Sequence, residues 1–303
     1  MAAGAVEARE LRKVFGDTVA VDRLSLSVAR GEVFGFLGPN GAGKTTTVNL
    51  LLDLVRPTSG EALILGRPPG DPDTKARVGF LPEHFRFPSW LTATGFLHMH
   101  SRLMGLPAAK RRALVPEVLE RVGLADRGST KLGAFSKGMT QRIGLAQAIL
   151  GEPELVFLDE PTSALDPLGR REVRDIIREL RDKGVTVFLN SHLLSEVEVT
   201  CDRVAIVKDG AVVRTGTLDE LTGAAVELDV TADGLTPELV AGLERWGATS
   251  RQSERRITVI LHGRDDVPAV ADWLVRGGAS LHALEPRRAS LEEMFVHIVG
   301  DQL

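Results

Sequence analysis

The sequence predicts an α/β fold built on a mixed β-sheet, followed by a smaller α+β domain. Apolar runs of strand length, such as Leu155–Leu158, alternate with amphipathic helical segments, which is typical of strands buried on both faces of a sheet. A glycine-rich turn at 38–43 joins a short apolar strand to a helix. After about Thr222 the order of expected elements becomes β-α-β-β-α-β, the ferredoxin-like pattern.

Length and composition limit the class of protein. The 303 residues fit two domains, although one large α/β domain is also possible, and 43% hydrophobic with 26% charged residues excludes a disordered or fibrous chain. No apolar run approaches the roughly 20 residues of a membrane span, and no basic stretch followed by an apolar one lies near the N-terminus, so we expect neither a membrane span nor a signal peptide. A net charge of −4 argues against a nucleic-acid coat protein. The single cysteine, Cys201, fits a reducing compartment, so we expect a cytoplasmic protein.

Residues 1–222 are expected to form the first domain. Alternating apolar and polar positions predict an N-terminal β region, whose antiparallel strands precede the glycine-rich turn. Before residue 90, the expected elements are strands at Val6–Phe15, Thr18–Val28 and Val33–Leu37, a helix at Gly43–Leu54, and strands at Ala62–Leu65 and Arg77–Leu81.

A block of helical spacing interrupts this domain from about Trp90 to Leu150, and we expect it to form an inserted helical subdomain. Alternation of strands and helices then returns. The expected elements are strands at Glu154–Leu158, Thr186–Asn190, Arg203–Lys208 and Val212–Thr217, with helices at Leu168–Lys183 and Leu193–Val199.

Residues 223–303 are expected to form an accessory domain, and they contain no motif for catalysis. Its expected elements are strands at Ala225–Val230, Thr249–Gln252, Arg256–Leu261 and Ser280–Leu284, with helices at Thr236–Trp246, Asp266–Arg276 and Ser290–Val299.

The glycine-rich turn carries the clearest chemical motif. Its sequence is Gly38-Pro39-Asn40-Gly41-Ala42-Gly43-Lys44-Thr45, followed by Thr46, and it matches the P-loop pattern G-x-x-x-x-G-K-[ST]. Glycines let backbone N–H groups surround phosphates, and the start of the helix adds its positive dipole end. Lys44 can then reach the β- and γ-phosphates, and the Thr45 hydroxyl can bind Mg²⁺. The alternative is a glycine turn that only begins a helix, but the strand before it favours nucleotide binding.

Two carboxylates follow the apolar strand that ends at Leu158. The carboxyl edge of an α/β sheet is where ligands bind, so Asp159 and Glu160 are expected there. Asp159 can belong to the Mg²⁺ shell, and Glu160 can orient or deprotonate water for in-line attack. The alternative is a polar strand end before the turn at Pro161.

A second helix start precedes this strand. The segment Phe135-Ser136-Lys137-Gly138-Met139 has Ser and Gly where a helix could bind an anion. At this point residues 5–220 resemble the ATP-binding cassette (ABC) ATPases, whose signature usually reads L-S-G-G-Q. Ser136 and Gly138 fit that signature, whereas Phe135, Lys137 and Met139 depart from it.

The resemblance implies further site residues. Phe15 matches the aromatic residue that stacks on adenine, or else it is a core strand residue. Glu83 is at the Q-loop position, where glutamine is usual, and is expected to offer oxygen to metal or water; the alternative is a solvated loop acid. Asp166 matches the D-loop at the dimer interface, and His192 matches the switch histidine that contacts γ-phosphate.

The resemblance also implies partners and location. Two cassettes pair head to tail in this family, so each ATP is expected between Lys44 of one copy and Ser136 of the other. One complete set of motifs favours a homodimer over pairing with a related chain. Because no membrane span is expected, the leading hypothesis is the ATPase subunit of an ABC transporter. It would hydrolyse ATP on the cytoplasmic face of the membrane and drive a separate integral membrane permease.

The C-terminal segment 286–295 resembles the tail of ATPase subunits from multidrug or antibiotic exporters, which favours export over import. Two alternatives remain open. A soluble ABC ATPase could act on ribosomes or nucleic acid, but the chain has neither a second cassette nor a long coiled-coil insertion, so no nucleic-acid partner is expected. Alternatively, the C-terminal domain could bind a small regulatory ligand.

Overall fold

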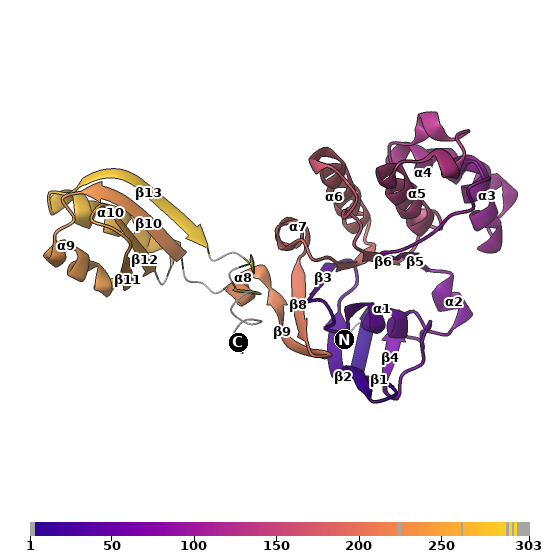
Figure 1. Ribbon diagram of the computed structural model, residues 1–303, viewed down its shortest axis with the longest axis horizontal. Coiled ribbons are helices and arrows are strands. Elements are labelled where there is room, and N and C mark those ends of the chain that lie inside the picture. The colour runs from indigo at the N-terminus through magenta and orange to yellow at the C-terminus, as the bar shows by residue number, and fades with distance from the viewer. Residues whose placement is uncertain (1–3, 223–225, 262, 289–290, 293, 296–303) are drawn as a thin grey trace. The chain divides into compact units, whose positions relative to one another are not determined.

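The computed structural model describes residues 4–222, 226–261, 263–288, 291–292 and 294–295. The chain divides into two compact units after Thr215 (Figure 1). The first unit contains both the three-stranded and the six-stranded sheet, and the second contains a four-stranded sheet. The expected domain boundary at Thr222 lies a few residues beyond this division.

The three-stranded sheet has the order β2-β1-β4 and is antiparallel. Its strands are β1 (Val6–Phe15), β2 (Thr18–Val28) and β4 (Ser59–Ile64). β1 and β2 form a hairpin in which Phe15 pairs with Thr18, and Gly16 takes the left-handed conformation that this tight turn requires. Val6, Ala8 and Leu11 of β1 are buried, so one side of the hairpin packs on the core.

The six-stranded sheet has the order β5-β6-β7-β3-β8-β9. Its strands are β3 (Val33–Leu37), β5 (Val78–Leu81), β6 (Leu155–Asp159), β7 (Thr186–Asn190), β8 (Arg203–Lys208) and β9 (Ala211–Thr217). The pairs from β5 to β8 are parallel, and a two-residue turn with positive φ at Asp209 and Gly210 joins β8 to β9. The carboxyl ends of β3, β6 and β7 therefore meet at one edge.

Aromatic rings fix these central strands together. The ring centroid of Phe188 on β7 lies 5.7 Å from that of Phe34, 5.3 Å from that of Phe36 and 5.1 Å from that of Phe157. All four side chains are fully buried or nearly so. Residues at neighbouring positions of three strands thus form one aromatic cluster under the edge that carries the motifs.

Helix α1 (Lys44–Leu51) begins directly after the glycine-rich turn. It ends before the expected limit at Leu54 because Leu52 caps the helix and Asp53 adopts a left-handed backbone with φ of 56°. The other helices of the first unit outside the insert are α2 (Pro72–Lys75), α6 (Pro167–Asp182) and α7 (Leu194–Thr200).

The helical insert consists of α3 (Ala93–Leu103), α4 (Ala108–Arg121) and α5 (Lys137–Ile149), which pack on one another (Figure 1). Thr92 and Ser136 cap α3 and α5 by accepting backbone N–H groups with their hydroxyls. Two 3₁₀ turns, at Ala125–Arg127 and Leu132–Ala134, connect α4 to α5.

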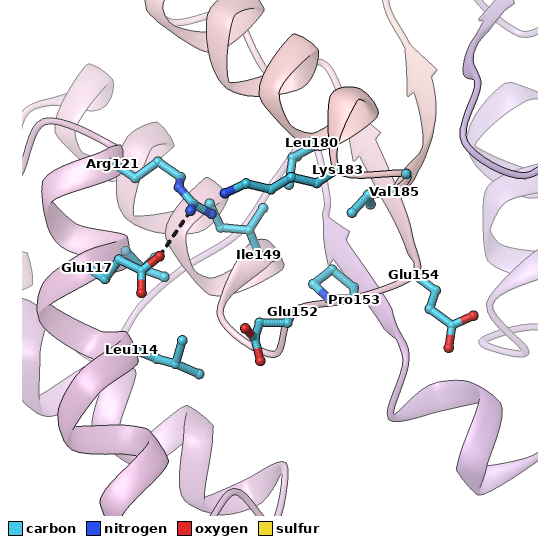
Figure 2. A pocket seen from close by; sticks show the side chains of 12 residues that line it. Leu114, Glu117, Arg121, Ile149, Glu152, Pro153, Glu154, Leu180, Lys183 and Val185 are labelled. Carbon is cyan, nitrogen blue, oxygen red and sulfur yellow. Dashed lines mark hydrogen bonds and ion pairs between the residues drawn. The ribbon is translucent and has the colours of Figure 1, made fainter.

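The insert meets the core around a cavity of about 370 Å³ (Figure 2). Leu114, Ile149 and Leu180 supply part of its apolar lining. At its rim Arg121 of α4 lies 3.1 Å from Glu117 and 3.4 Å from Glu179 of α6. The Arg121–Glu117 pair lies within α4, whereas the Arg121–Glu179 pair connects the insert to the core on the amino-terminal side of β6 and β7, away from the motif-bearing edge.

The second unit has an antiparallel sheet of order β11-β12-β10-β13, which is the ferredoxin-like order. Its elements are α8 (Leu218–Thr222), β10 (Val226–Asp233), α9 (Pro237–Ala241), β11 (Gly247–Arg251), β12 (Arg256–Leu261), α10 (Val267–Arg276) and β13 (Ser280–Arg288).

Two expectations for this unit need comment. The helix expected at Thr236–Trp246 consists of the short α9 and a 3₁₀ helix at Gly242–Arg245. The closing helix expected at Ser290–Val299 lies largely outside the described residues. Within the ranges that the structure describes, no helix combines the length and the hydropathy needed to cross a membrane.

Replacing Phe188 with Ala should lower the free energy of unfolding by about 3–5 kcal/mol, because a fully buried ring leaves a cavity among three other rings. Phe15→Ala is the matched control: its side chain is 49% exposed, so the loss should be about 1 kcal/mol or less. Urea denaturation followed by circular dichroism measures both. Equal losses for the two variants would contradict the assigned core.

Candidate nucleotide-binding site

The glycine-rich turn lies between the carboxyl end of β3 and the start of α1. A Cβ at Gly38 would collide with the carbonyl oxygen of Val207, and one at Gly43 would collide with that of Ala20. Gly41 and Gly43 also have φ of 82° and 90°, which side chains rarely tolerate. Glycine is therefore required here for close backbone packing and for the curvature that turns N–H groups toward a phosphate.

Lys44 occupies the inside of this turn. Its ammonium donates hydrogen bonds to the carbonyl oxygens of Gly38 at 2.8 Å and Pro39 at 3.1 Å. Burial lowers the pKa of Lys44, and the nearby carboxylates of Glu160, Asp159 and Glu83 partly oppose that shift. A half-buried cation beside these carbonyls can bind anionic oxygens without leaving the turn.

The turn borders a cavity of about 520 Å³. Segments from four strand ends and one hairpin contribute to its walls. The lining residues are Thr18, Val19, Ala20, Asn40, Gly41, Gly43, Lys44, Thr45, Thr46, Glu83, Glu160, Asn190 and His192. Ala42 is buried beneath the turn instead of lining the cavity.

Asp159, the last residue of β6, is buried beside this cavity. The side-chain amide of Asn190, at the end of β7, donates a hydrogen bond to Asp159 Oδ1. Burial raises the pKa of Asp159, the neighbouring Glu83 and Glu160 carboxylates raise it further, and the Asn190 hydrogen bond and Lys44 oppose the rise. This concentration of negative charge is an environment that a cation would stabilise.

Glu160 is held in an unusual conformation. Its φ is 53°, in the left-handed region, and its backbone N–H donates to the carbonyl oxygen of Asn190 at 2.8 Å. Its carboxylate accepts a 2.8 Å hydrogen bond from the backbone N–H of His192, whose ring Nδ1 lies 2.7 Å from the other oxygen. The amide of Gln141 on α5 donates to the Glu160 carbonyl at 3.1 Å. The side chain is thus buried but lines the cavity, a position from which a carboxylate could accept a proton from a bound water.

Glu83 and Thr45 face the same cavity from other segments. The Glu83 side chain is 46% exposed, and its charge acts on both Lys44 and Asp159. Within the described part of the chain, no group of three or more His, Cys, Asp or Glu side chains could hold a metal ion. The oxygens of Asp159, Thr45 and Glu83 nevertheless fit Mg²⁺, which commonly takes one or two carboxylates together with substrate phosphates.

The structure does not bring Phe15 into the cavity lining, although Thr18 and Val19 of the same hairpin line it. The Phe15 ring is 49% exposed, and the Lys13 ammonium lies 4.8 Å from its centroid. This exposure rules out the alternative of a core strand residue. The exposed Phe15 ring at the rim of the hairpin can therefore contact a bound molecule.

Three expected ligands, Ser136, Gly138 and Asp166, lie together in a second pocket of about 520 Å³. Ser136 caps α5 by accepting the N–H of Met139 at 3.2 Å, and Asp166 caps α6 by accepting the N–H of Gly169 at 2.8 Å. None of the three lines the cavity beside Lys44. One chain therefore presents two separate anion-compatible pockets.

The structure adds residues that the sequence patterns had not singled out. Asn190 supports both acidic residues at the end of β6: its side-chain amide donates to Asp159, and its carbonyl accepts from the Glu160 N–H. The sequence signal that could have identified Asn190 is its position at the end of an apolar strand, just before Ser191 and His192. The wall formed by Thr18–Ala20 had no such signal, because its place depends on how the hairpin packs.

Comparison with known proteins also identifies the ABC transporter family. The ABC transporter family profile matches residues 21–163. An uncharacterised ABC transporter ATP-binding protein of Nostoc sp. (strain PCC 7120) is 41% identical over 97% of this chain and 89% of its own. The daunorubicin resistance ATP-binding protein of Streptomyces coeruleorubidus is 37% identical over 99% of this chain and 98% of its own.

A solved structure agrees with the fold. It is a dimeric ATP-binding cassette in a post-hydrolysis state bound to ADP and Pi, with a TM-score of 0.65 and 25% identity, and it covers 70% of this chain and 98% of that one. The chain belongs to the ATP-binding proteins of ABC transporters. It is an ABC-type ATPase that carries the P-loop fold with a mixed sheet and a helical insert.

Replacing Glu160 with Gln should keep ATP binding but lower the hydrolysis rate about 100-fold or more, because the amide cannot accept a proton from water. Lys44→Ala is the contrasting variant and should weaken binding itself. Titration with a fluorescent ATP analogue measures binding, and phosphate release measures turnover. Undiminished hydrolysis by the Glu160→Gln protein would remove Glu160 from the reaction.

Proposed function

We propose that this chain is the ATP-hydrolysing subunit of an ABC exporter, that it closes as a homodimer around two ATP molecules, and that it drives a permease on a separate chain. The observation that most supports a homodimer is that the two pockets lie apart on one chain. The cavity at Lys44 and Glu160 has no signature residue, and the pocket at Ser136 has no P-loop residue.

Pairing two copies head to tail would bring these pockets together. The turn at Lys44 of one copy would surround the phosphates, while Ser136 and the start of α5 of the other would offer N–H groups and a positive helix end. Asp166, beside Ser136, would then lie at the interface. The dimeric state of the solved cassette supports this arrangement.

Within each site the residues have distinct tasks. Lys44 would bind the β- and γ-phosphates, and Asp159, Thr45 and Glu83 would supply oxygens to Mg²⁺, which neutralises phosphate charge when bound. Glu160 would accept a proton from the attacking water. His192, whose Nδ1 lies 2.7 Å from Glu160, would orient that carboxylate and face the γ-phosphate. Phe15, at the rim of the hairpin, would stack on adenine.

The relatives support transport out of the cell. Those matched include proteins named for daunorubicin resistance, bacitracin transport, linearmycin resistance and Nod factor export. ATP-binding subunits of ABC transporters work with a membrane permease, so this chain would act on the cytoplasmic face of the membrane. Residues 223–303, which lie within the second unit, would form an accessory domain.

The permease should co-purify with the tagged Glu160→Gln protein from detergent-solubilised membranes in Mg-ATP, because blocked turnover holds the closed complex. The expected result is a multi-span membrane protein in near-stoichiometric amount, identified by mass spectrometry. An untagged preparation is the control for background. Recovery with ribosomes, DNA or soluble proteins alone would overturn the transporter assignment while leaving the ATPase chemistry intact.

A further inference from the structure

Two departures from the usual family motifs meet in one place. Glu83 replaces the usual glutamine, and Lys137 replaces a glycine of the signature. Both line a third cavity, of about 750 Å³, which lies between the loop after β5, the start of α5 and the segment at Ser163. Two substitutions of opposite charge therefore face one space, although they are far apart in the sequence.

Lys137 is placed where a cation is unfavourable. It is the first residue of the 13-residue helix α5, directly after the capping residue Ser136. Backbone N–H groups give that end of a helix a partial positive charge, which favours anions over cations. Lys137 is exposed, and among the described residues it has no carboxylate within 4.0 Å. The helix itself therefore does not stabilise a lysine at this position. An anionic group across the cavity would stabilise it.

Glu83 is the carboxylate that the cavity offers. Its side chain is 46% exposed and also lines the nucleotide cavity, so the residue belongs to both spaces. The other titratable groups around the third cavity are His84, whose Nδ1 lies 3.9 Å from Glu83, and Arg86. Arg86 belongs to the same loop as Glu83, whereas Lys137 belongs to the insert.

We propose that Lys137 is a positioning residue for Glu83: attraction between the ammonium and the carboxylate across this cavity ties the start of α5 to the edge of the nucleotide site. The inference rests on the proposed role of Glu83 as an oxygen ligand of Mg²⁺ in the nucleotide site. It assigns to this chain an electrostatic connection between insert and core that a glutamine and a glycine at these positions could not make.

The remaining contacts of α5 explain why this matters for turnover. Gln141, one turn along the helix from Lys137, donates to the backbone carbonyl of Glu160. The first turns of α5 therefore make one hydrogen bond to Glu160, through Gln141, and place the charged Lys137 on the cavity that Glu83 lines. Through this attraction, a change in the position of Glu83 would change the position of α5, which presents Ser136 to the partner copy.

A double-mutant cycle in the full chain tests the proposal. Lys137→Gln should lower kcat for ATP hydrolysis about threefold to fivefold, the size expected for two partly exposed charges, with the KM for ATP within about twofold. Lys137→Arg should restore the rate because it keeps the charge. Arg86→Gln, on the same cavity, is the matched control and should change kcat by less than about twofold.

The Glu83→Gln background separates the interaction from other effects. There Lys137→Gln should change kcat by less than about twofold, because its partner charge has been removed. The wild-type advantage over Lys137→Gln should also shrink at high salt. If Lys137→Gln leaves kcat unchanged, or if its effect persists in the Glu83→Gln background, the proposal is wrong and Lys137 acts elsewhere, for instance on ATP bound by the partner copy. If Glu83→Gln alone leaves turnover unchanged, the failure lies in the proposed role of Glu83.

Discussion

The parallel pairing of β3, β6 and β7 is the constraint on which the rest of the structure depends. Because β3 lies beside β7 and β7 lies beside β6, the turn at Lys44, the pair Asp159–Glu160 and the segment at His192 all emerge at one sheet edge. The buried aromatic cluster centred on Phe188 holds these strands in register below that edge. Charged groups that would repel one another in isolation are kept close by packing energy that the hydrophobic core supplies.

That edge is also where the backbone is strained. Glu160 has a left-handed conformation that costs on the order of 1–3 kcal/mol for a non-glycine residue. Three hydrogen bonds maintain it: the Glu160 N–H donates to the Asn190 carbonyl, the Gln141 amide donates to the Glu160 carbonyl, and the His192 N–H donates to the Glu160 carboxylate. If Glu160 deprotonates water as proposed, a carboxylate fixed in this way would not have to be reorganised for that step. Asn190 and Gln141 therefore hold the strained backbone of Glu160 in place.

The sequence allowed the strands of both units, the P-loop and the acidic pair to be predicted, because each depends on local patterns: apolar runs, glycines before a helix, and carboxylates after a strand. Features that depend on packing could not be predicted. Asn190 supports Asp159 only because β7 lies beside β6, and the early end of α1 follows from the backbone of Asp53. The common cavity of Glu83 and Lys137 likewise depends on how the insert packs against the core.

The central claim is that the pocket at Ser136 completes the site at Lys44 of a second copy, and light scattering of the Glu160→Gln protein in Mg-ATP tests it most directly. The account predicts particles of twice the mass of the single chain. Ser136→Asp in the same background should prevent their formation, because aspartate still caps α5 but repels the γ-phosphate, whereas the uncharged cap Ser136→Asn should allow it. A dimer that forms equally well with Ser136→Asp, or no dimer in any variant, would contradict the account.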